Sequence, residues 1–157
     1  MANRFFENFS QVEKNLYIGD LLTSIDYNTL LKYNINFILV CGEELSCRYP
    51  QDFTYKHLPI KDTPSTPIDQ YFDDAFKFIS IGLKRGSVLV HCAQARSRSV
   101  SIILSYLMKS RQIKYSKALE ILKKHHPQAE PNSGFHKQLL QYEREVVKSS
   151  SCMNSIF

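Results

Sequence analysis

One segment of the chain combines residue types that together could hold and attack an anion. It spans residues 91–99, HCAQARSRS, and continues an apolar run that starts at Ser87. We expect the run to form a buried strand and a helix to begin within the segment. At such a strand–loop–helix junction backbone N–H groups converge on an anion, and the helix dipole adds positive potential. Cys92, at the start of the loop, is therefore favoured as a thiolate, which is the nucleophilic form.

Arg98 follows Cys92 after five intervening residues, so one turn of loop can return its guanidinium to the same anion. The planar guanidinium matches two phosphate oxygens and the equatorial oxygens of a phosphoryl transition state. A lone cysteine at a strand end is usually a core residue, and a lone arginine is usually on the surface. With His91 before the cysteine and Ser99 after the arginine, we favour a phosphate-binding loop.

The elements around this segment alternate between short apolar runs and helical patterns. Strands are predicted at residues 15–19, 37–41, 55–60 and 87–91, and helices at residues 24–32, 66–83, 97–109, 116–124 and 132–146. Predicted helix caps are Ser24, Thr66, Ser116 and Asn132. The helix at 97–109 is apolar almost all round and should be central and buried. Alternating strands and helices indicate an α/β fold with a mostly parallel sheet, in which ligands bind beyond the carboxyl ends of the strands.

Length and composition indicate one globular domain. The chain has 157 residues, of which 43% are hydrophobic and 22% charged, and its net charge is +5. We assign residues 1–148 to the domain and residues 149–157 to a flexible C-terminal tail. The sequence has no apolar run of membrane-spanning length, no signal peptide and no glycine at position 2 for myristoylation. We therefore expect a cytoplasmic protein, possible also in the nucleus, without stable membrane association.

Charge and metal-binding residue types argue against two further classes of function. The densest basic stretch is residues 123–126, KKHH, which we interpret as a solvated helix end rather than a nucleic-acid contact. The four cysteines form no C-x-x-C pair, and the five histidines are not at ligand spacing. We expect neither a metal site nor a cofactor.

Several segments together resemble one family. Residues 91–99 resemble the phosphate-binding loop of the cysteine-based protein phosphatases. Residues 15–19, 71–79 and 131–143 are similar to the first strand, the helix after the acid loop and the closing helix of their dual-specificity branch. The resemblance covers residues 10–147. It implies a central, mostly parallel sheet of four or five strands with helices on both faces, in a small atypical member of the family.

The resemblance also implies roles for individual residues. Cys92 is the expected nucleophile, Arg98 the phosphate clamp, Asp62 the general acid, and Ser99 the donor that stabilises the departing thiolate. The expected substrate-binding residues are His91, Ala93, Gln94, Ala95, Arg96, Ser97 and Arg98, with His91 orienting the loop. Asp69, Asp73 and Asp74 compete with Asp62, but they are better explained as first-turn charges favourable to a helix dipole. Asn132 either tethers the loop or simply caps its own helix.

Two residues of the loop depart from the family pattern. Ala95 stands where the family almost always has glycine, and an alanine costs about 1–2 kcal/mol if that position needs a positive φ. Gln94 replaces the usual alanine and should be tolerated. Arg96 adds a cation that is also found in phospholipid phosphatases, although an exposed side chain near a helix start explains it better. Cys41 ends a neighbouring strand and could form a reversible disulfide with Cys92, but a buried core cysteine is the favoured interpretation.

The leading hypothesis is therefore a metal-independent protein phosphatase that acts on phosphotyrosine and phosphoserine/threonine in phosphoprotein substrates. Ala95 supports a first alternative, a pseudophosphatase that binds phosphopeptides without turnover. Arg96 and the basic composition support a second, a phospholipid phosphatase.

Overall fold

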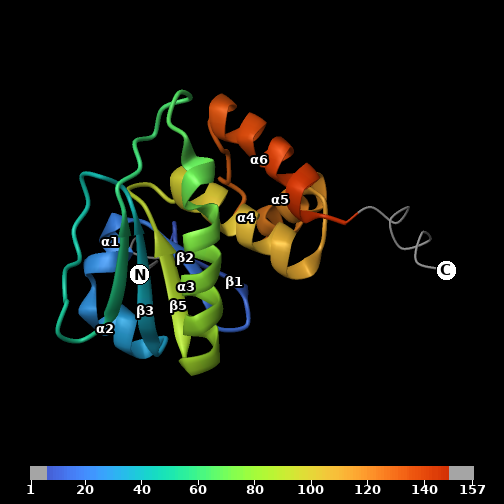
Figure 1. Cartoon of the computed structure of the whole chain (residues 1–157). Coiled ribbons are helices and arrows are strands. Elements are labelled where there is room, and N and C mark those ends of the chain that lie inside the picture. Colours follow the sequence, from blue (N-terminus) through green and yellow to red (C-terminus); the bar gives the residue numbers. More distant parts are fainter. Residues whose placement is uncertain (1–6, 149–157) are drawn as a thin grey trace.

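Five short strands form a single sheet in the order β1-β2-β5-β3-β4. The computed structural model describes residues 7–148, and Figure 1 shows the sheet with its helices. The strands are β1 (Ser10–Glu13), β2 (Leu16–Gly19), β3 (Ile35–Cys41), β4 (Thr54–Leu58) and β5 (Ser87–His91). β1 pairs antiparallel with β2, whereas all other neighbouring strands are parallel. The sheet is therefore mostly parallel, as predicted.

β5 is the central strand, and every one of its residues is buried. Val90 pairs with Ile18 of β2 on one side and with Leu39 of β3 on the other. A strand covered on both faces favours a continuous run of β-branched and aliphatic residues, which is what β5 contains. Because β2, β5, β3 and β4 are parallel, their carboxyl ends share one edge, and the loop after β5 lies in the middle of it.

The helices lie on both faces of the sheet (Figure 1). They are α1 (Leu21–Ile25), α2 (Tyr27–Lys32), α3 (Phe72–Arg85), α4 (Arg98–Arg111), α5 (Tyr115–His125) and α6 (Ser133–Val146), and the 3-10 helix η2 (Ile68–Tyr71) precedes α3. α4 is buried along most of its length and contacts α3, α5 and α6, which confirms the predicted central helix. The helix after the loop is thus held rigidly at its position.

The prediction of one helix from Ser24 is wrong. Two short helices occupy this region, and aspartates cap both of them. Asp20 accepts a hydrogen bond from Thr23 N at 2.9 Å, and Asp26 accepts one from Thr29 N. The Ser24 hydroxyl instead donates to a backbone carbonyl within α1. A second capping aspartate six residues after the first ends one helix and starts the next.

Two other predicted caps are also wrong, and one strand was missed. The Thr66 hydroxyl pairs with Thr63 instead of capping, and the chain enters α3 through η2 without a side-chain cap. α5 begins at Tyr115, after Lys114, so Ser116 is not its cap. β1 escaped prediction because only one of its four residues is buried, which leaves no apolar run. The other four strands were predicted to within two residues.

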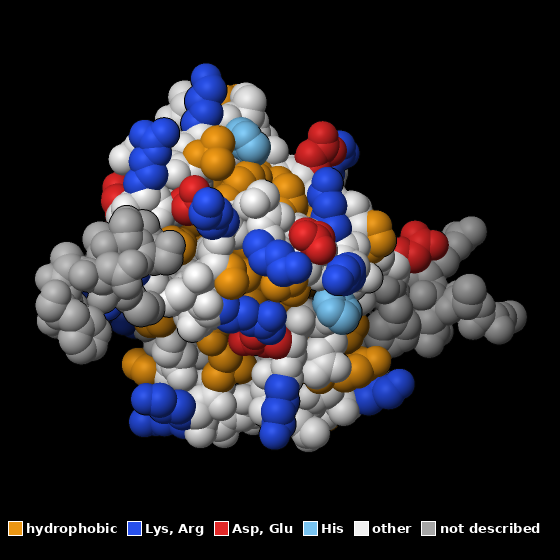
Figure 2. All heavy atoms as spheres, turned by 90° about the vertical axis from the view of Figure 1, so that its right-hand side faces the viewer, with side chains coloured by type: hydrophobic (Ala, Val, Ile, Leu, Met, Phe, Trp, Pro, Cys, Tyr) orange, Lys and Arg blue, Asp and Glu red, His pale blue; other side chains and the backbone are white. Residues whose placement is uncertain are grey.

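Charged side chains are mixed on the face shown in Figure 2, where Asp and Glu lie among dispersed Lys and Arg. No helix within residues 7–148 is long and apolar enough to cross a membrane. The predicted tail, residues 149–157, lies outside the described residues.

Candidate active site

The loop between β5 and α4 lies in the middle of the carboxyl edge of the sheet (Figure 1). It lines a pocket of about 160 Å³ together with one aspartate from the loop after β4. The lining residues are Asp62, Cys92, Ala93, Gln94, Arg96, Ser97 and Arg98. The structure thus brings the predicted nucleophile, phosphate clamp and general acid to a single pocket. The first residue of α1 supports the loop, since Leu21 N donates to Ala93 O at 3.1 Å.

Cys92 and Ser99 face each other at the base of the loop. The Cys92 sulfur lies 3.0 Å from the Ser99 hydroxyl oxygen, and both side chains are buried. Ser99 belongs to the first turn of α4, where the helix N-terminus carries partial positive charge. The Ser99 hydroxyl is therefore placed to donate a hydrogen bond to the sulfur of Cys92.

Arg98 is buried and is held by Glu44, a residue that the sequence analysis did not predict to belong to the site. Its two terminal nitrogens contact the two carboxylate oxygens of Glu44 at 2.8 and 2.6 Å, and one of them also donates to Ile60 O at 3.1 Å. These hydrogen bonds lower the pKa of Glu44, which keeps the carboxylate ionised. Glu44 lies in the loop that follows β3 and so reaches the same edge of the sheet as the phosphate loop. An acidic residue just after a predicted parallel strand is the only sequence signal that could have found it.

Asp62 is tied to α6 by Asn132. The Asn132 amide nitrogen donates to an Asp62 carboxylate oxygen at 2.9 Å, and its amide oxygen caps α6 by accepting from Phe135 N at 2.9 Å. The Asn132 backbone N–H also donates to the Ser97 hydroxyl at 2.9 Å. Both roles considered for Asn132 are therefore present together, and the residue links the acid loop to the phosphate loop.

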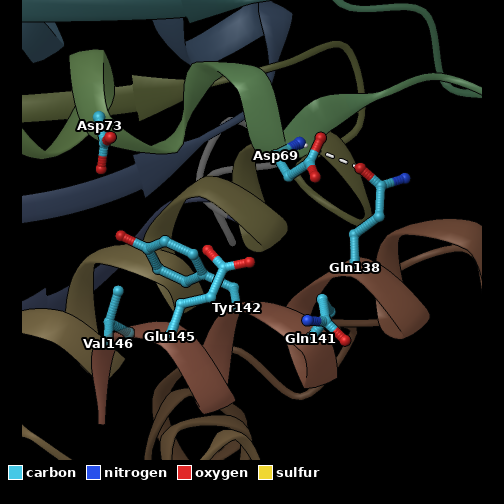
Figure 3. Close-up of a pocket in the computed structure, with 7 residues that line it drawn as sticks. All are labelled: Asp69, Asp73, Gln138, Gln141, Tyr142, Glu145 and Val146. Carbon is cyan, nitrogen blue, oxygen red and sulfur yellow. Dashed lines mark hydrogen bonds between the residues drawn. The ribbon is translucent and has the colours of Figure 1, made fainter.

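The far end of the acid loop is held to α6 as well. Gln138 reaches from α6 toward η2, where its side-chain oxygen accepts from Asp69 N at 3.0 Å (Figure 3). Its side-chain nitrogen donates to Thr66 O at 2.9 Å. Asp69, Asp73 and Asp74 lie in the first turns of η2 and α3, as predicted, and do not line the active-site pocket. Among these acids, Asp62 is the one placed to exchange a proton with a group bound at Cys92.

His91 is buried beneath the loop. Burial lowers its pKa to about 4, so the ring is neutral at physiological pH. Its Nδ1 lies 3.3 Å from Cys92 O. Because a carbonyl oxygen only accepts hydrogen bonds, Nδ1 carries the proton. This geometry fits the predicted orienting role.

Ala95 adopts the backbone conformation that would favour glycine. Its φ is 55°, and the residue is completely buried. The position therefore needs a positive φ, and an alanine there costs about 1–2 kcal/mol of backbone strain. Its carbonyl oxygen lies 2.5 Å from Nε2 of His126, a buried residue that sequence reasoning assigned to a solvated helix end. That assignment is wrong for His126, because its ring is completely buried against the phosphate loop.

Two remaining hypotheses concern Arg96 and Cys41. Arg96 is exposed and forms an ion pair with Glu130 at 2.5 Å, as expected for a side chain near a helix start. Cys41 is completely buried, and burial, followed by the nearby charge of Cys92, raises its pKa well above the ordinary thiol value. Both thiols are free. Val40 of β3 pairs with His91 of β5, so the residues that follow them, Cys41 and Cys92, lie near each other. Reversible disulfide formation between them stays a prediction.

Comparison with known proteins agrees with this geometry. A family model described as the catalytic domain of dual specificity phosphatases matches residues 16–145. Dual specificity protein phosphatase 1B of Arabidopsis thaliana is 36% identical over 141 residues, which cover 89% of this chain and 84% of the relative. A mouse protein described as a dual specificity phosphatase, complexed with zinc tungstate, has a similar structure with a TM-score of 0.85 and 25% identity, covering 92% of each chain. The human tyrosine phosphatase-like serine/threonine/tyrosine-interacting protein has a TM-score of 0.85 and 27% identity, covering 89% of this chain and 98% of the other. This chain therefore belongs to the dual specificity phosphatase family.

Proposed function

We propose that this chain hydrolyses phosphotyrosine and phosphoserine or phosphothreonine in proteins, without a metal ion and through a phosphocysteine on Cys92. The observation that carries the proposal is the single pocket shared by Cys92, Arg98 and Asp62. A nucleophile, an anion-binding group and a proton donor are together sufficient for phosphoryl transfer to a thiol. The names of the relatives support protein phosphates as the substrate class.

In the first step the Cys92 thiolate attacks phosphorus, and the bond between phosphorus and the leaving oxygen breaks. Asp62 donates its proton to that oxygen, because an alkoxide or phenoxide is a poor leaving group until it is protonated. The products are a free alcohol or phenol and a phosphocysteine.

In the second step water attacks the phosphocysteine and transfers a proton to the Asp62 carboxylate. The sulfur–phosphorus bond breaks, and inorganic phosphate leaves. The Ser99 hydroxyl, 3.0 Å from the sulfur, donates to the thiolate that re-forms.

The charge that a metal would neutralise in other phosphatases is matched here by protein groups. The Arg98 guanidinium lines the pocket, and the loop presents backbone N–H groups next to the N-terminus of α4. Activity that persists in EDTA is therefore expected.

The test is hydrolysis of a small aryl phosphate in EDTA by the wild type, Cys92→Ser and Cys47→Ser. Cys47 is a free, half-buried cysteine outside the pocket lining and serves as the matched control. We expect turnover in the wild type and in Cys47→Ser, and none in Cys92→Ser. Turnover that survives in Cys92→Ser, or that EDTA abolishes, would contradict the mechanism. A panel of phosphopeptides and phosphoinositides then identifies the substrate class.

The strained Ala95 favours one second candidate, a binding module that holds phosphopeptides without turnover. Its φ of 55° raises the free energy of the phosphate-binding conformation. A folded wild type that binds orthovanadate but does not turn over aryl phosphate would support this candidate, and Ala95→Gly should then restore turnover. The phospholipid alternative is weaker, because Glu130 neutralises the Arg96 charge on which it depends.

A further inference from the structure

The phosphate loop contains a residue whose backbone needs outside support. Ala95 has a φ of 55° and is completely buried. In this left-handed conformation the Cβ atom crowds the following carbonyl oxygen, so an alanine relaxes toward other conformations more readily than a glycine. A contact that fixes the Ala95 peptide is therefore needed to keep the loop in its phosphate-binding shape.

His126 supplies that contact. Its Nε2 lies 2.5 Å from Ala95 O, and its Nδ1 lies 2.9 Å from the Ser10 hydroxyl. The carbonyl oxygen only accepts, so Nε2 carries the proton and donates it. Burial lowers the pKa of His126, so the ring is neutral at physiological pH and Nδ1 accepts from Ser10. Both ring nitrogens are engaged, and the ring cannot rotate without breaking a buried hydrogen bond.

The direction of this hydrogen bond matters for the pocket. A trans peptide is planar, so its carbonyl and its N–H point to opposite sides. When His126 holds the Ala95 carbonyl on the outer side of the loop, the N–H of Arg96 is directed to the inner side. Arg96 is one of the residues that line the pocket.

The rest of the connection between α5 and α6 supports the same stretch of loop. Glu130 N donates to Arg96 O at 2.9 Å, and Asn132 N donates to the Ser97 hydroxyl at 2.9 Å. Residues 126–132 therefore contact three consecutive residues of the phosphate loop from its outer side. Only the contact made by His126 comes from a buried side chain.

We propose that His126 is a positioning residue for the phosphate loop, whose Nε2–H holds the Ala95 carbonyl and so keeps an alanine in a conformation suited to glycine. The inference rests on the proposed function, because it assumes that the loop binds phosphate. The contribution of His126 to phosphate binding therefore depends on the residue at position 95.

The test is a double-mutant cycle of His126→Leu and Ala95→Gly, read out by orthovanadate affinity in titration calorimetry and by kcat/KM for an aryl phosphate. We expect His126→Leu to weaken both by about tenfold in the wild-type background, the effect of one net hydrogen bond. In the Ala95→Gly background the same change should weaken them by less than about threefold, because glycine adopts a positive φ without strain. His126→Gln, which retains an N–H donor, should lose less than His126→Leu.

Two controls separate positioning from general stability, and thermal denaturation monitors folding of every variant. Ser10→Ala removes the other partner of the ring but leaves the Ala95 contact, and His125→Leu changes the exposed neighbour. His125→Leu should stay within about twofold of the wild type, as surface changes usually do, and Ser10→Ala should lose clearly less than His126→Leu because the Ala95 contact remains. If His126→Leu does not fold, the cycle is run with His126→Gln, for which a smaller loss that shrinks in the glycine background is expected.

An equal loss in both backgrounds would overturn the inference, as would a loss in Ser10→Ala that matches that of His126→Leu. A wild type that binds no vanadate would overturn it as well. Vanadate binding without turnover would instead contradict the proposed function alone, and the vanadate cycle would still decide the role of His126.

Discussion

Replacing Glu44 with glutamine tests how far the proposed turnover depends on the orientation of Arg98. The wild-type pair has two charge-assisted hydrogen bonds, at 2.8 and 2.6 Å, and Arg98 is buried. Glutamine keeps one acceptor oxygen, so the variant loses one hydrogen bond and the compensating charge. A hydrogen bond to a charged group contributes about 1.5–3 kcal/mol.

The Glu44 side chain is 49% exposed, so water screens part of this interaction. We therefore expect a loss of about 1–2 kcal/mol in transition-state stabilisation, which corresponds to a decrease of about 5- to 30-fold in kcat/KM. The fall should appear in kcat as well as KM, because Arg98 faces charge that is redistributed in the transition state.

The assay is steady-state hydrolysis of an aryl phosphate by the wild type, Glu44→Gln and Glu43→Gln. Glu43 is the matched control, since its contact with Lys61 is long, at 4.0 Å, and both side chains are exposed. Glu43→Gln should stay within about twofold of the wild type. Equal activities for the two variants, with both proteins folded, would refute the reasoning that Glu44 orients Arg98.

Three further predictions concern the surroundings of the loop. Burial lowers the pKa of His91 from 6.5 to about 4, so between these pH values the unfolded chain binds one more proton than the folded protein. The stability that this neutral histidine contributes is fully present above pH 6.5, and about 3 kcal/mol of it is lost as the pH falls to 4. In urea denaturation the stability of His91→Gln should depend less steeply on pH than that of the wild type, and an unchanged slope would contradict this prediction. Asn132→Ser retains a helix cap but loses the donor to Asp62, so kcat should fall severalfold while stability changes little, whereas Asn132→Ala should also lose about 1 kcal/mol of stability. An unchanged kcat in Asn132→Ser would argue against a role of the Asn132–Asp62 hydrogen bond in turnover. A Cβ atom at Gly134 would overlap the Pro64 carbonyl group, so Gly134→Ala should shift the acid loop and lower kcat. The free energy of unfolding, measured with denaturant, should fall by about 1–3 kcal/mol, and full activity of the variant would contradict the prediction.

Local signals made much of the fold and part of the site predictable. The apolar run of β5, the apolar helix α4 and the Asn132 cap depend on neighbours within a few residues, and the structure contains all three. The Ser24 cap failed because two aspartates capped better, a competition that the hydrophobic pattern does not reveal.

Contacts between distant segments were beyond reach of the same reasoning. Glu44 lies 54 positions from Arg98, and an acidic pair after a strand has the composition of a surface loop. His126 lies 31 positions from Ala95 and sits beside a proline at a helix end, where exposure is the usual outcome. Glu44 reaches the loop because it follows a parallel strand whose end lies at the same edge of the sheet, whereas His126 reaches it through the connection between α5 and α6. The groups of the proposed reaction could be recognised from the sequence, and so could His91 and Asn132 beside them. Glu44 and His126, which contact the loop from distant segments, could not.

Different parts of the fold hold the nucleophile, the arginine and the general acid of the proposed reaction in place. Cys92 and Arg98 are fixed by the central strand and the buried helix α4, whereas Asp62 lies on a loop held to α6 by side-chain hydrogen bonds. Disturbing α6 should therefore impair protonation of the leaving group more than binding of the phosphate. The effect should be largest for alkyl phosphates, whose leaving groups depend most on a general acid, and smallest for activated aryl phosphates. The contacts of Asn132 with Asp62 thus favour the phosphoserine and phosphothreonine half of the proposed dual specificity.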